Sequence, residues 1–328
     1  MMGEMIPEAG ILRQKVRERV RAAVLAPSAD PTLPAFTRYF QERFGSPLLA
    51  VILYGSCLSP VTRRESSIYD FFLICDRYRP FYRNRKLALF NYCLPPNIFY
   101  FELTAPAFGR LAGKYSVTSL RDFRHETSAR ARDNYHLGRF AKRVVIAYTR
   151  EERIREELTD AILSAMEQNI RLTLPCLPGR FPRDEFVRTL LGMSYRGETR
   201  VDVDTKVEEL FQAESEYYRQ CYGDLLLAHL QEKKIGAEAD GCYSLPEKSV
   251  RRGYRRLWVR ARLFQTRIRT YLRWPKYIIT FDNWLDYLLS KLERSKGIRL
   301  ELNERERKYP LIFGWKHFFR LKRAGKIR

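Results

Sequence analysis

The first 150 residues alternate between two hydrophobic periodicities. Apolar residues at helical spacing predict one helix over Ile11–Leu25 and a shorter one over Pro34–Phe44. Three compact apolar runs have the length and composition of buried strands: Leu48–Leu53, Ile68–Ile74 and the aromatic-rich Asn97–Leu103. A helix over Leu120–Arg132 and an apolar run over Val144–Tyr148 follow. We therefore predict an α/β (α+β) unit with a mixed sheet over residues 1–150.

Helical periodicity continues from Arg153 to Leu230 and is broken mainly at prolines: Pro175, Pro178 and Pro182. Residues 231–248 (QEKKIGAEADGCYSLPEK) are polar and contain glycines and a proline, which is typical of a linker. The predicted division is one domain over 1–150, a smaller helical domain over 151–235, and a linker with a C-terminal region over 236–328.

A long amphipathic segment, Ser249–Trp274, follows the predicted linker. One side carries large apolar residues at three- and four-residue steps: Tyr254, Leu257, Trp258, Ala261, Phe264, Ile268, Tyr271 and Leu272. The other side carries arginines: Arg252, Arg255, Arg256, Arg262, Arg267 and Arg269. Such a helix lies in the interface of an anionic membrane or packs its apolar side on the protein, and the pattern leaves both open. Asp282–Leu292 and Pro310–Arg328 repeat the mixture of aromatic and basic residues.

Positive charge is concentrated in the C-terminal region. The formal net charge is +22; residues 251–328 hold 23 Lys and Arg against 6 Asp and Glu, whereas the first 250 hold 37 against 32. A nearly neutral body with a basic tail indicates an anionic partner surface, either a membrane or, less favoured, a nucleic acid. No run of 18 apolar residues is present, so we expect peripheral membrane association without a membrane span.

The cysteines, the N-terminus and the hydrophobic content argue against a zinc or redox protein, a secreted protein and a disordered chain. The six cysteines form no CxxC pair, so zinc and redox motifs lack support, and buried free thiols in a reducing compartment are expected. The N-terminal residues lack a signal-peptide core, and Glu4, Glu8 and Glu18 favour an ordinary helix over a transit peptide. A hydrophobic content of 45% excludes a disordered chain. The oligomeric state is left open.

The main chemical signal lies at the ends of the first two predicted strands. The first strand runs into Tyr54-Gly55-Ser56, and Asp70 stands on the second, 14 residues after Ser56. Glycine lets the backbone approach a triphosphate, and the Ser56 hydroxyl with neighbouring N–H groups can hold phosphate oxygens. A carboxylate on the adjacent strand can hold Mg²⁺ beside the α-phosphate. This is the opening pattern of the nucleotidyltransferase fold.

The usual second metal-binding carboxylate, two residues after Asp70, is replaced by Phe72. We expect another acid to complete the site, and the candidates are Asp76, which ends the same strand, and Glu102 on the third. A carboxylate on an aromatic strand is costly to bury without a partner, which favours a metal role for Glu102. The alternative is that Glu102 pairs with an arginine.

Several segments in order along the chain resemble the mitochondrial Tam-type CTP:phosphatidate cytidylyltransferases, from about Ala50 to Leu257. The similar segments are Leu53–Ser56 (LYGS), Ile68–Cys75 (IYDFFLIC), Ile98–Leu103 (IFYFEL), Lys114–Val117 (KYSV), Tyr135–Lys142 (YHLGRFAK), Leu191–Arg200 (LGMSYRGETR) and Asp204–Val207 (DTKV). The chain departs from the family pattern at Cys57 and Ser116, which replace glycines, and at Phe101-Glu102.

The resemblance implies a nucleotidyltransferase domain, a winged-helix-like second domain, CTP in the cleft between them and Mg²⁺ as cofactor. It implies synthesis of CDP-diacylglycerol from CTP and phosphatidic acid by a peripheral membrane enzyme on the cytoplasmic face, or the matrix side of the inner mitochondrial membrane in a eukaryote. Asp70 and Lys114 are the candidate catalytic residues. The candidate phosphate-binding residues are Tyr54, Gly55, Ser56, Arg139, Lys142, Arg200 and Lys206.

The chemistry of the acceptor agrees with this set of cations. A phosphate monoester is largely ionised at neutral pH, because its second pKa is about 6. It therefore needs charge neutralisation more than a general base, and neither His125 nor His136 is assigned a role. Two alternatives stay open: a nucleotidyltransferase that acts on RNA or protein, and an adaptor built on an inactive nucleotidyltransferase fold.

Overall fold

The chain forms two compact units, residues 1–276 and 277–328. The computed structural model describes residues 8–25, 30–58, 68–196, 203–232, 235–238, 241–245 and 249–280. It further describes residues 285, 289, 293, 299–309, 316–317, 320–321 and 323. The predicted segments Asp282–Leu292 and Pro310–Arg328 therefore lie mostly outside the described residues.

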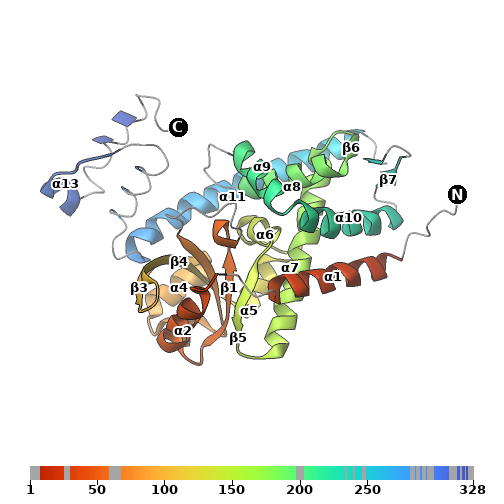
Figure 1. Cartoon of the computed structure of the whole chain (residues 1–328). Helices are drawn as coiled ribbons and strands as arrows, with labels where there is room; N and C mark the ends of the chain where they lie inside the picture. Colours follow the sequence, from red (N-terminus) through yellow and green to blue (C-terminus); the bar gives the residue numbers. More distant parts are fainter. Residues whose placement is uncertain are drawn as a thin grey trace. The chain divides into compact units, whose positions relative to one another are not determined.

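The first unit contains a mixed five-stranded sheet, as the sequence predicts (Figure 1). The strand order is β3-β4-β2-β1-β5. Only β2 and β4 run parallel, and the other neighbours pair antiparallel. The strands are β1 (Leu48–Tyr54), β2 (Tyr69–Cys75), β3 (Asn97–Ala105), β4 (Gly109–Ser119) and β5 (Val145–Thr149).

Both faces of the central strands are buried, which is why β1 and β2 read as continuous apolar runs. Ile52 and Phe72 lie on the face that packs against α6 (Tyr135–Phe140) and α7 (Glu152–Thr173). Val51 and Phe71 lie on the other face, against α2 (Leu33–Phe44) and two short helices. Those short helices are α3 (Tyr78–Tyr82) and α4 (Arg85–Cys93).

Two predicted elements differ from the structure. β4 was not expected, because its first half, with Gly109, Arg110 and Gly113, has no apolar run; it pairs with β3 from Ala105↔Gly109 to Asn97↔Val117. The helix predicted over 120–132 ends early, as α5 (Leu120–Glu126). In β4, pairing with the neighbouring strand β3 outweighs the local sequence preference.

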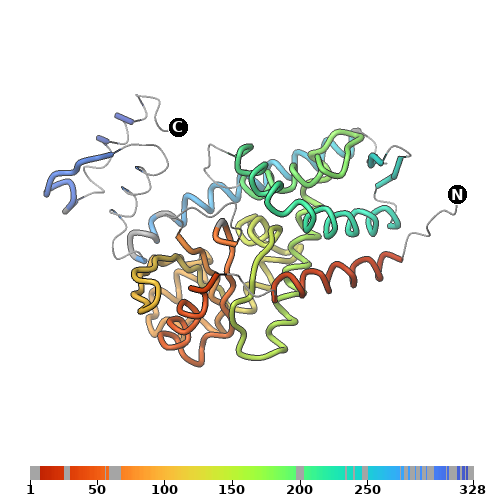
Figure 2. Tube along the Cα trace, viewed as in Figure 1, coloured from red at the N-terminus to blue at the C-terminus, as the bar shows by residue number. Residues whose placement is uncertain are grey.

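Helices dominate the remainder of the first unit. They are α1 (Ala9–Leu25), α7, α8 (Arg183–Arg196), α9 (Val203–Ala213), α10 (Ser215–Gln231) and α11 (Ser249–Thr280), with the 3₁₀ turns η1 (Ser56–Leu58) and η2 (Leu174–Cys176). The first helix lies alongside α10 and also packs on α7 (Figure 2). Its buried positions, Leu12, Val16, Val20 and Val24, follow the predicted helical spacing.

The segment predicted as a linker contains two short strands within its described residues. β7 (Gly236–Ala237) and β8 (Cys242–Ser244) join β6 (Arg180–Pro182) in a small antiparallel sheet of order β6-β8-β7. Tyr243 stacks on Phe181 with ring centroids 6.0 Å apart. This contact supplies the apolar anchor that a polar, glycine-containing segment lacks on its own.

Among the described helices, none has the length and hydropathy of a membrane span. The cysteines are free thiols, three of them buried: Cys57, Cys75 and Cys221. In the second unit, α13 (Glu304–Lys308) begins with a capping box between Asn303 and Glu306. His317 lies 3.0 Å from the Glu306 carboxylate.

Candidate active site

The candidate site begins where β1 ends in a glycine turn beside a carboxylate. Tyr54 pairs with Asp70 across the antiparallel strands, and Gly55 follows with a φ of 91°. A Cβ on Gly55 would lie 3.4 Å from Oδ2 of Asp70. Glycine therefore provides the left-handed backbone angle and leaves one side of the carboxylate uncovered. The Ser56 backbone starts η1, while its side chain is outside the described part.

A lysine lies on the other side of this carboxylate. β4 runs parallel to β2 with Lys114 directly opposite Asp70, and Nζ of Lys114 is 3.6 Å from Oδ1 of Asp70. Both side chains keep partial access to solvent, at 23% for Lys114 and 32% for Asp70. Tyr54, Asp70 and Lys114 thus form one row across three neighbouring strands, with a cation and an anion in contact.

An arginine of helix α6, Arg139, is hydrogen-bonded with Tyr54 of this row. The guanidinium of Arg139 lies 3.6 Å from the ring centre of Tyr135 and donates a hydrogen bond of 3.0 Å to the Tyr135 carbonyl. Burial and the charge of Asp70 raise the pKa of Tyr54, against the charge and hydrogen bond of Arg139. Tyr54 is therefore a neutral phenol that is hydrogen-bonded with Arg139 and is the strand partner of Asp70.

Close packing fixes α6 against the helical part of the unit. A Cβ on Gly138 would lie 2.8 Å from the carbonyl oxygen of Ser194 on α8, so a larger residue would push the helices apart. Just after α6, Nζ of Lys142 lies 4.1 Å from the ring centre of Tyr195. Two candidate cations, Arg139 and Lys142, therefore stand where α6 meets α8.

The remaining predicted cations are placed less closely. Lys206 forms a 2.7 Å ion pair with Glu209 one turn further along α9, and no described contact joins it to Asp70. Arg200 lies outside the described residues.

The structure does not bring the three predicted metal-binding acids together. Asp76 follows the opposite end of β2 and pairs with Arg77 at 3.6 Å. It lies six residue steps along the extended chain from Asp70, roughly 20 Å. Glu102 on β3 accepts a 2.6 Å hydrogen bond from Tyr100 and a 2.9 Å hydrogen bond from Nε of Arg110. Within the described residues, no three His, Cys, Asp or Glu side chains form a metal-type cluster.

Glu102 therefore has the arginine partner that the sequence left as the alternative. Hydrogen bonds from Tyr100 and Arg110 lower its pKa. We expect Glu102→Gln to leave turnover and its Mg²⁺ dependence within about twofold of wild type, because exposed ion pairs contribute little. A Mg²⁺ titration of initial rates measures this. Arg110→Gln removes the same pair and is the matched control; a large rise in the Mg²⁺ requirement of Glu102→Gln alone would restore a metal role.

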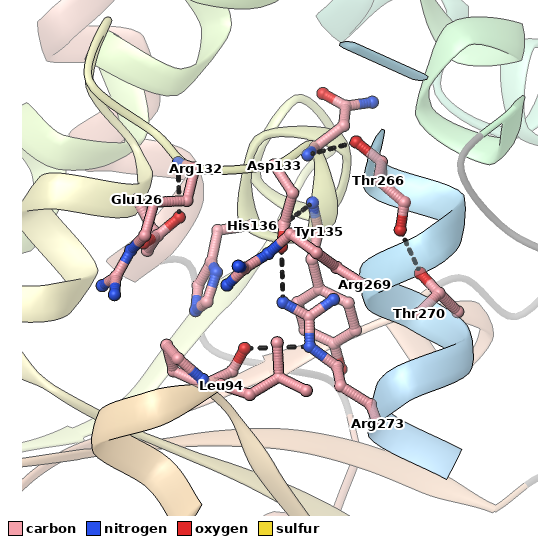
Figure 3. A network of polar contacts seen from close by, with 12 residues as sticks. Leu94, Glu126, Arg132, Asp133, Tyr135, His136, Thr266, Arg269, Thr270 and Arg273 are labelled. Carbon is pink, nitrogen blue, oxygen red and sulfur yellow. Dashed lines mark hydrogen bonds and ion pairs between the residues drawn. The ribbon is translucent and has the colours of Figure 1, made fainter. Parts of the chain in front are cut away.

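A buried carboxylate that the sequence did not single out lies just before α6. Asp133 is 1% exposed and accepts hydrogen bonds from Arg269 at 2.7 Å and Arg273 at 2.6 Å, both on α11 (Figure 3). Burial alone would raise its pKa, but the charge of Arg273, the N–H of Tyr135 and both arginine hydrogen bonds hold the pKa well below its usual range. The only signal in the sequence was its place two residues before the YHLGRF segment.

Helix α11 is attached to the body by its basic side. Arg256 donates to the carbonyls of Pro175 and Leu177, and Arg262 to that of Ala131. Nζ of Lys276 reaches three carbonyls around the end of α4, at 2.6 to 3.3 Å, and burial lowers its pKa to about 7. Charged groups, together with the buried Val259 and Thr266, thus form the protein-facing side of the helix.

The apolar side of α11 faces away from the body. Trp258 is 53% exposed, Phe264 64% and Tyr254 73%, and Leu257, Ile268, Tyr271 and Leu272 are exposed with them. Packing of this side on the protein, one of the two sequence interpretations, is therefore wrong for the described part of the helix. Exposed arginines flank the apolar side: Arg251, Arg255, Arg260 and Arg267.

A glycine turn, a carboxylate and two cations at one end of a mixed sheet are groups that suit a substrate rich in phosphate. Residues 95–251 match the model of the Tam41/Mmp37 family, described as phosphatidate cytidylyltransferase, mitochondrial. The chain thus carries a phosphatidate cytidylyltransferase family domain, and this family makes CDP-diacylglycerol. No curated protein matches the chain.

The matched residues cover part of the candidate site. They include Lys114, Arg139 and Lys142, and they begin after Gly55 and Asp70. The resemblance noted from the sequence extended further towards the N-terminus, to about Ala50. The sheet register joins the two parts, because Asp70 is paired directly with Lys114.

Proposed function

We propose that the chain uses the Asp70 end of its sheet to bind CTP and transfers the cytidylyl group to phosphatidate. The observation that carries this proposal is the contact of Asp70 with Lys114, which links the Gly55–Asp70 turn to the family domain. In the reaction, a phosphate oxygen of phosphatidate forms a bond to the α-phosphorus of CTP. The bond from that phosphorus to the β-phosphate oxygen breaks, and pyrophosphate leaves.

The proposed site can accommodate Mg²⁺ as cofactor. Mg²⁺ is commonly bound by one or two carboxylates together with substrate phosphates and water. Asp70 provides one carboxylate, and the absence of a Cβ at Gly55 leaves Oδ2 accessible. When bound, Mg²⁺ would supply charge neutralisation at the α-phosphate.

The cations of the site provide the remaining charge compensation. The acceptor is a phosphate dianion approaching a triphosphate, so repulsion is the main obstacle. Lys114 and Arg139 approach from β4 and α6, and Lys142 stands one residue beyond Ala141 at the boundary with α8. Arg139 suits forked contacts to phosphate oxygens. Lys206 and Arg200 remain candidates for contacts further from the reacting phosphorus.

The proposed function also includes an assignment of two domains. We assign residues 1–150 to a nucleotidyltransferase-fold domain and 151–235 to a winged-helix-like domain. The mixed sheet supports the first, and α8, α9 and α10 with the small β6-β8-β7 sheet support the second. Because β7 and β8 pair with β6, the second domain extends to about residue 245.

The outward side of α11 supports a peripheral location on an anionic membrane, the matrix side of the inner membrane if the enzyme is mitochondrial. A helix with an apolar stripe flanked by exposed arginines binds by inserting the stripe among acyl chains while the arginines contact lipid phosphates. The substrate lipid is itself anionic. Docking through this side would leave the basic side of α11 on the body, where it is already bonded.

Removing the apolar anchors should reduce vesicle binding strongly. The double variant Trp258→Ser, Phe264→Ser loses two large exposed side chains, together worth roughly 3 kcal/mol, or about 100-fold in the partition coefficient. Co-sedimentation with vesicles containing phosphatidic acid measures this. Gln265→Ser, on the same exposed side, is the control and should bind as wild type. Unchanged partitioning of the double variant would refute membrane docking by α11.

Salt dependence gives a second measurement for the same surface. Arg255, Arg260 and Arg267 are exposed, so changing them to Gln should flatten the fall of binding with rising salt without unfolding the chain. Arg262 and Arg269 are unsuitable for this purpose because they bond to the body.

The proposed activity is tested by incubating the purified chain with labelled CTP, Mg²⁺ and phosphatidic acid vesicles. We expect a labelled lipid and an equal amount of pyrophosphate, with CTP preferred over ATP and GTP. Labelled RNA or labelled protein instead of lipid would favour the two acceptors left open by the sequence. Binding of CTP without release of pyrophosphate would favour an inactive adaptor.

A further inference from the structure

One tyrosine ring connects the amphipathic helix to the candidate nucleotide site. The guanidinium of Arg273, on α11, lies 4.8 Å from the ring centre of Tyr135, and that of Arg139 lies 3.6 Å from the same ring. Figure 3 shows Arg273 extending from α11 to Asp133 and Tyr135. Two arginines from distant parts of the chain thus contact a single side chain.

Tyr135 is held at three points. Its N–H donates a 2.9 Å hydrogen bond to Oδ1 of Asp133, its ring contacts Arg273, and its hydroxyl lies 3.4 Å from Oγ of Ser116 on β4. The residue is buried, with 6% exposure. Rotation of this ring would break its contact with the guanidinium of Arg139, which also donates to the Tyr135 carbonyl.

The position of Arg273 is more closely defined than packing requires. The side chain is 2% exposed, Nε donates to the Pro95 carbonyl at 2.9 Å and Nη2 to Asp133 at 2.6 Å. Among the described residues, Nη1 has no hydrogen-bond partner. A buried ion pair commonly adds little net stability over a well-packed apolar contact, whereas its directional bonds fix one geometry. A planar guanidinium also stacks on an aromatic ring in a way that an ammonium does not.

We propose that Arg273 is a positioning residue for nucleotide binding, which acts through Tyr135 to hold Arg139 at the phosphates of CTP. The inference rests on the proposed function, because it takes Arg139 as a nucleotide contact. It gives α11 a second role, since the helix that carries the exposed apolar stripe also completes the support of the nucleotide site.

Arg273→Lys tests this role in the full-length chain. Lysine keeps the charge beside Asp133 and loses the planar group against Tyr135. We expect KM for CTP and the calorimetric Kd for CTP, measured without lipid, to rise about tenfold while kcat changes little, as for loss of binding shared by ground and transition states. Arg256→Lys is the control: this arginine also anchors α11 through carbonyls, away from Tyr135, and its CTP affinity should equal wild type.

A double-mutant cycle tests whether Arg273 affects CTP binding through Arg139. If Arg273 acts through Arg139, then Arg273→Lys should have no further effect on CTP affinity in an Arg139→Lys background. Independent, additive effects would overturn the inference, as would unchanged CTP affinity of Arg273→Lys when the wild type binds CTP. Equal loss of affinity in Arg256→Lys and Arg273→Lys would reduce the role to general anchoring and also overturn it. A wild-type chain that binds no CTP would refute the proposed function and this inference together.

Discussion

Replacing Asp70 with Asn should reduce turnover on the order of 10²–10³-fold, the range found when one preorganised electrostatic group is removed from an active site. The substitution keeps the shape of the side chain and its place opposite Lys114, and removes a carboxylate that adjoins both Gly55 and Lys114. Initial rates of pyrophosphate release measure the effect. The melting temperature should change little, because the side chain is partly exposed and its only described ion pair spans 3.6 Å.

Asp76→Asn is the matched control for this prediction. It makes the same chemical change at the other end of β2, where the carboxylate is exposed and pairs with Arg77. Turnover of this variant should equal that of wild type. Near-normal activity in Asp70→Asn, or equal losses in both variants, would refute the proposed metal position.

Asp133→Asn should cost roughly 3–5 kcal/mol of folding free energy, the range for breaking a buried ion pair by removing one partner. The substitution leaves Arg269 and Arg273 in a buried environment with no compensating charge. Urea unfolding followed by circular dichroism measures the loss. Asp184→Asn is the control, because Asp184 makes a similar pair with Arg219 at the surface and its removal should cost much less.

The pH dependence of this contribution has a definite sign. The pKa of Asp133 is depressed in the folded chain, whereas an unfolded Asp titrates near 3.9. Its stabilisation is therefore complete at neutral pH and is lost as the pH falls below about 4 towards the folded pKa. A wild-type chain and an Asp133→Asn variant with equal stability at neutral pH would show that the two arginines find other partners.

Local patterns predicted the elements that carry Gly55 and Asp70. β1 and β2 are recognisable because both faces of each strand are buried, so the apolar signal is continuous. Asp76 was considered as a partner of Asp70 because the two are close in sequence, but they lie at opposite ends of β2. Along an extended strand each residue advances roughly 3.3 Å, so a residue that ends the strand is remote from one that begins it.

The orientation of α11 could not be predicted from its own residues. Periodicity shows that the helix has an apolar and a basic side, and burial of the apolar side is the usual outcome. The partners that reverse it, Asp133 and the carbonyls around Pro95 and Ala131, lie far away in the sequence. The same is true of the Tyr135–Arg273 contact, which exists only because the sheet, α6 and α11 fold together.

The reversed orientation of α11 also reverses which substitutions the helix tolerates. On most amphipathic helices an arginine can be exchanged for another polar residue, while the leucines and aromatics must keep their size. Here Arg273 and Arg269 make the specific contacts, so even lysine is a poor substitute. The apolar stripe needs only to stay hydrophobic. Exchanges such as Leu257→Ile or Phe264→Leu should therefore leave folding and membrane binding unchanged. Active variants selected from a library of random changes across α11 should therefore retain arginine at positions 269 and 273. At the positions of the apolar stripe they should vary freely among hydrophobic residues.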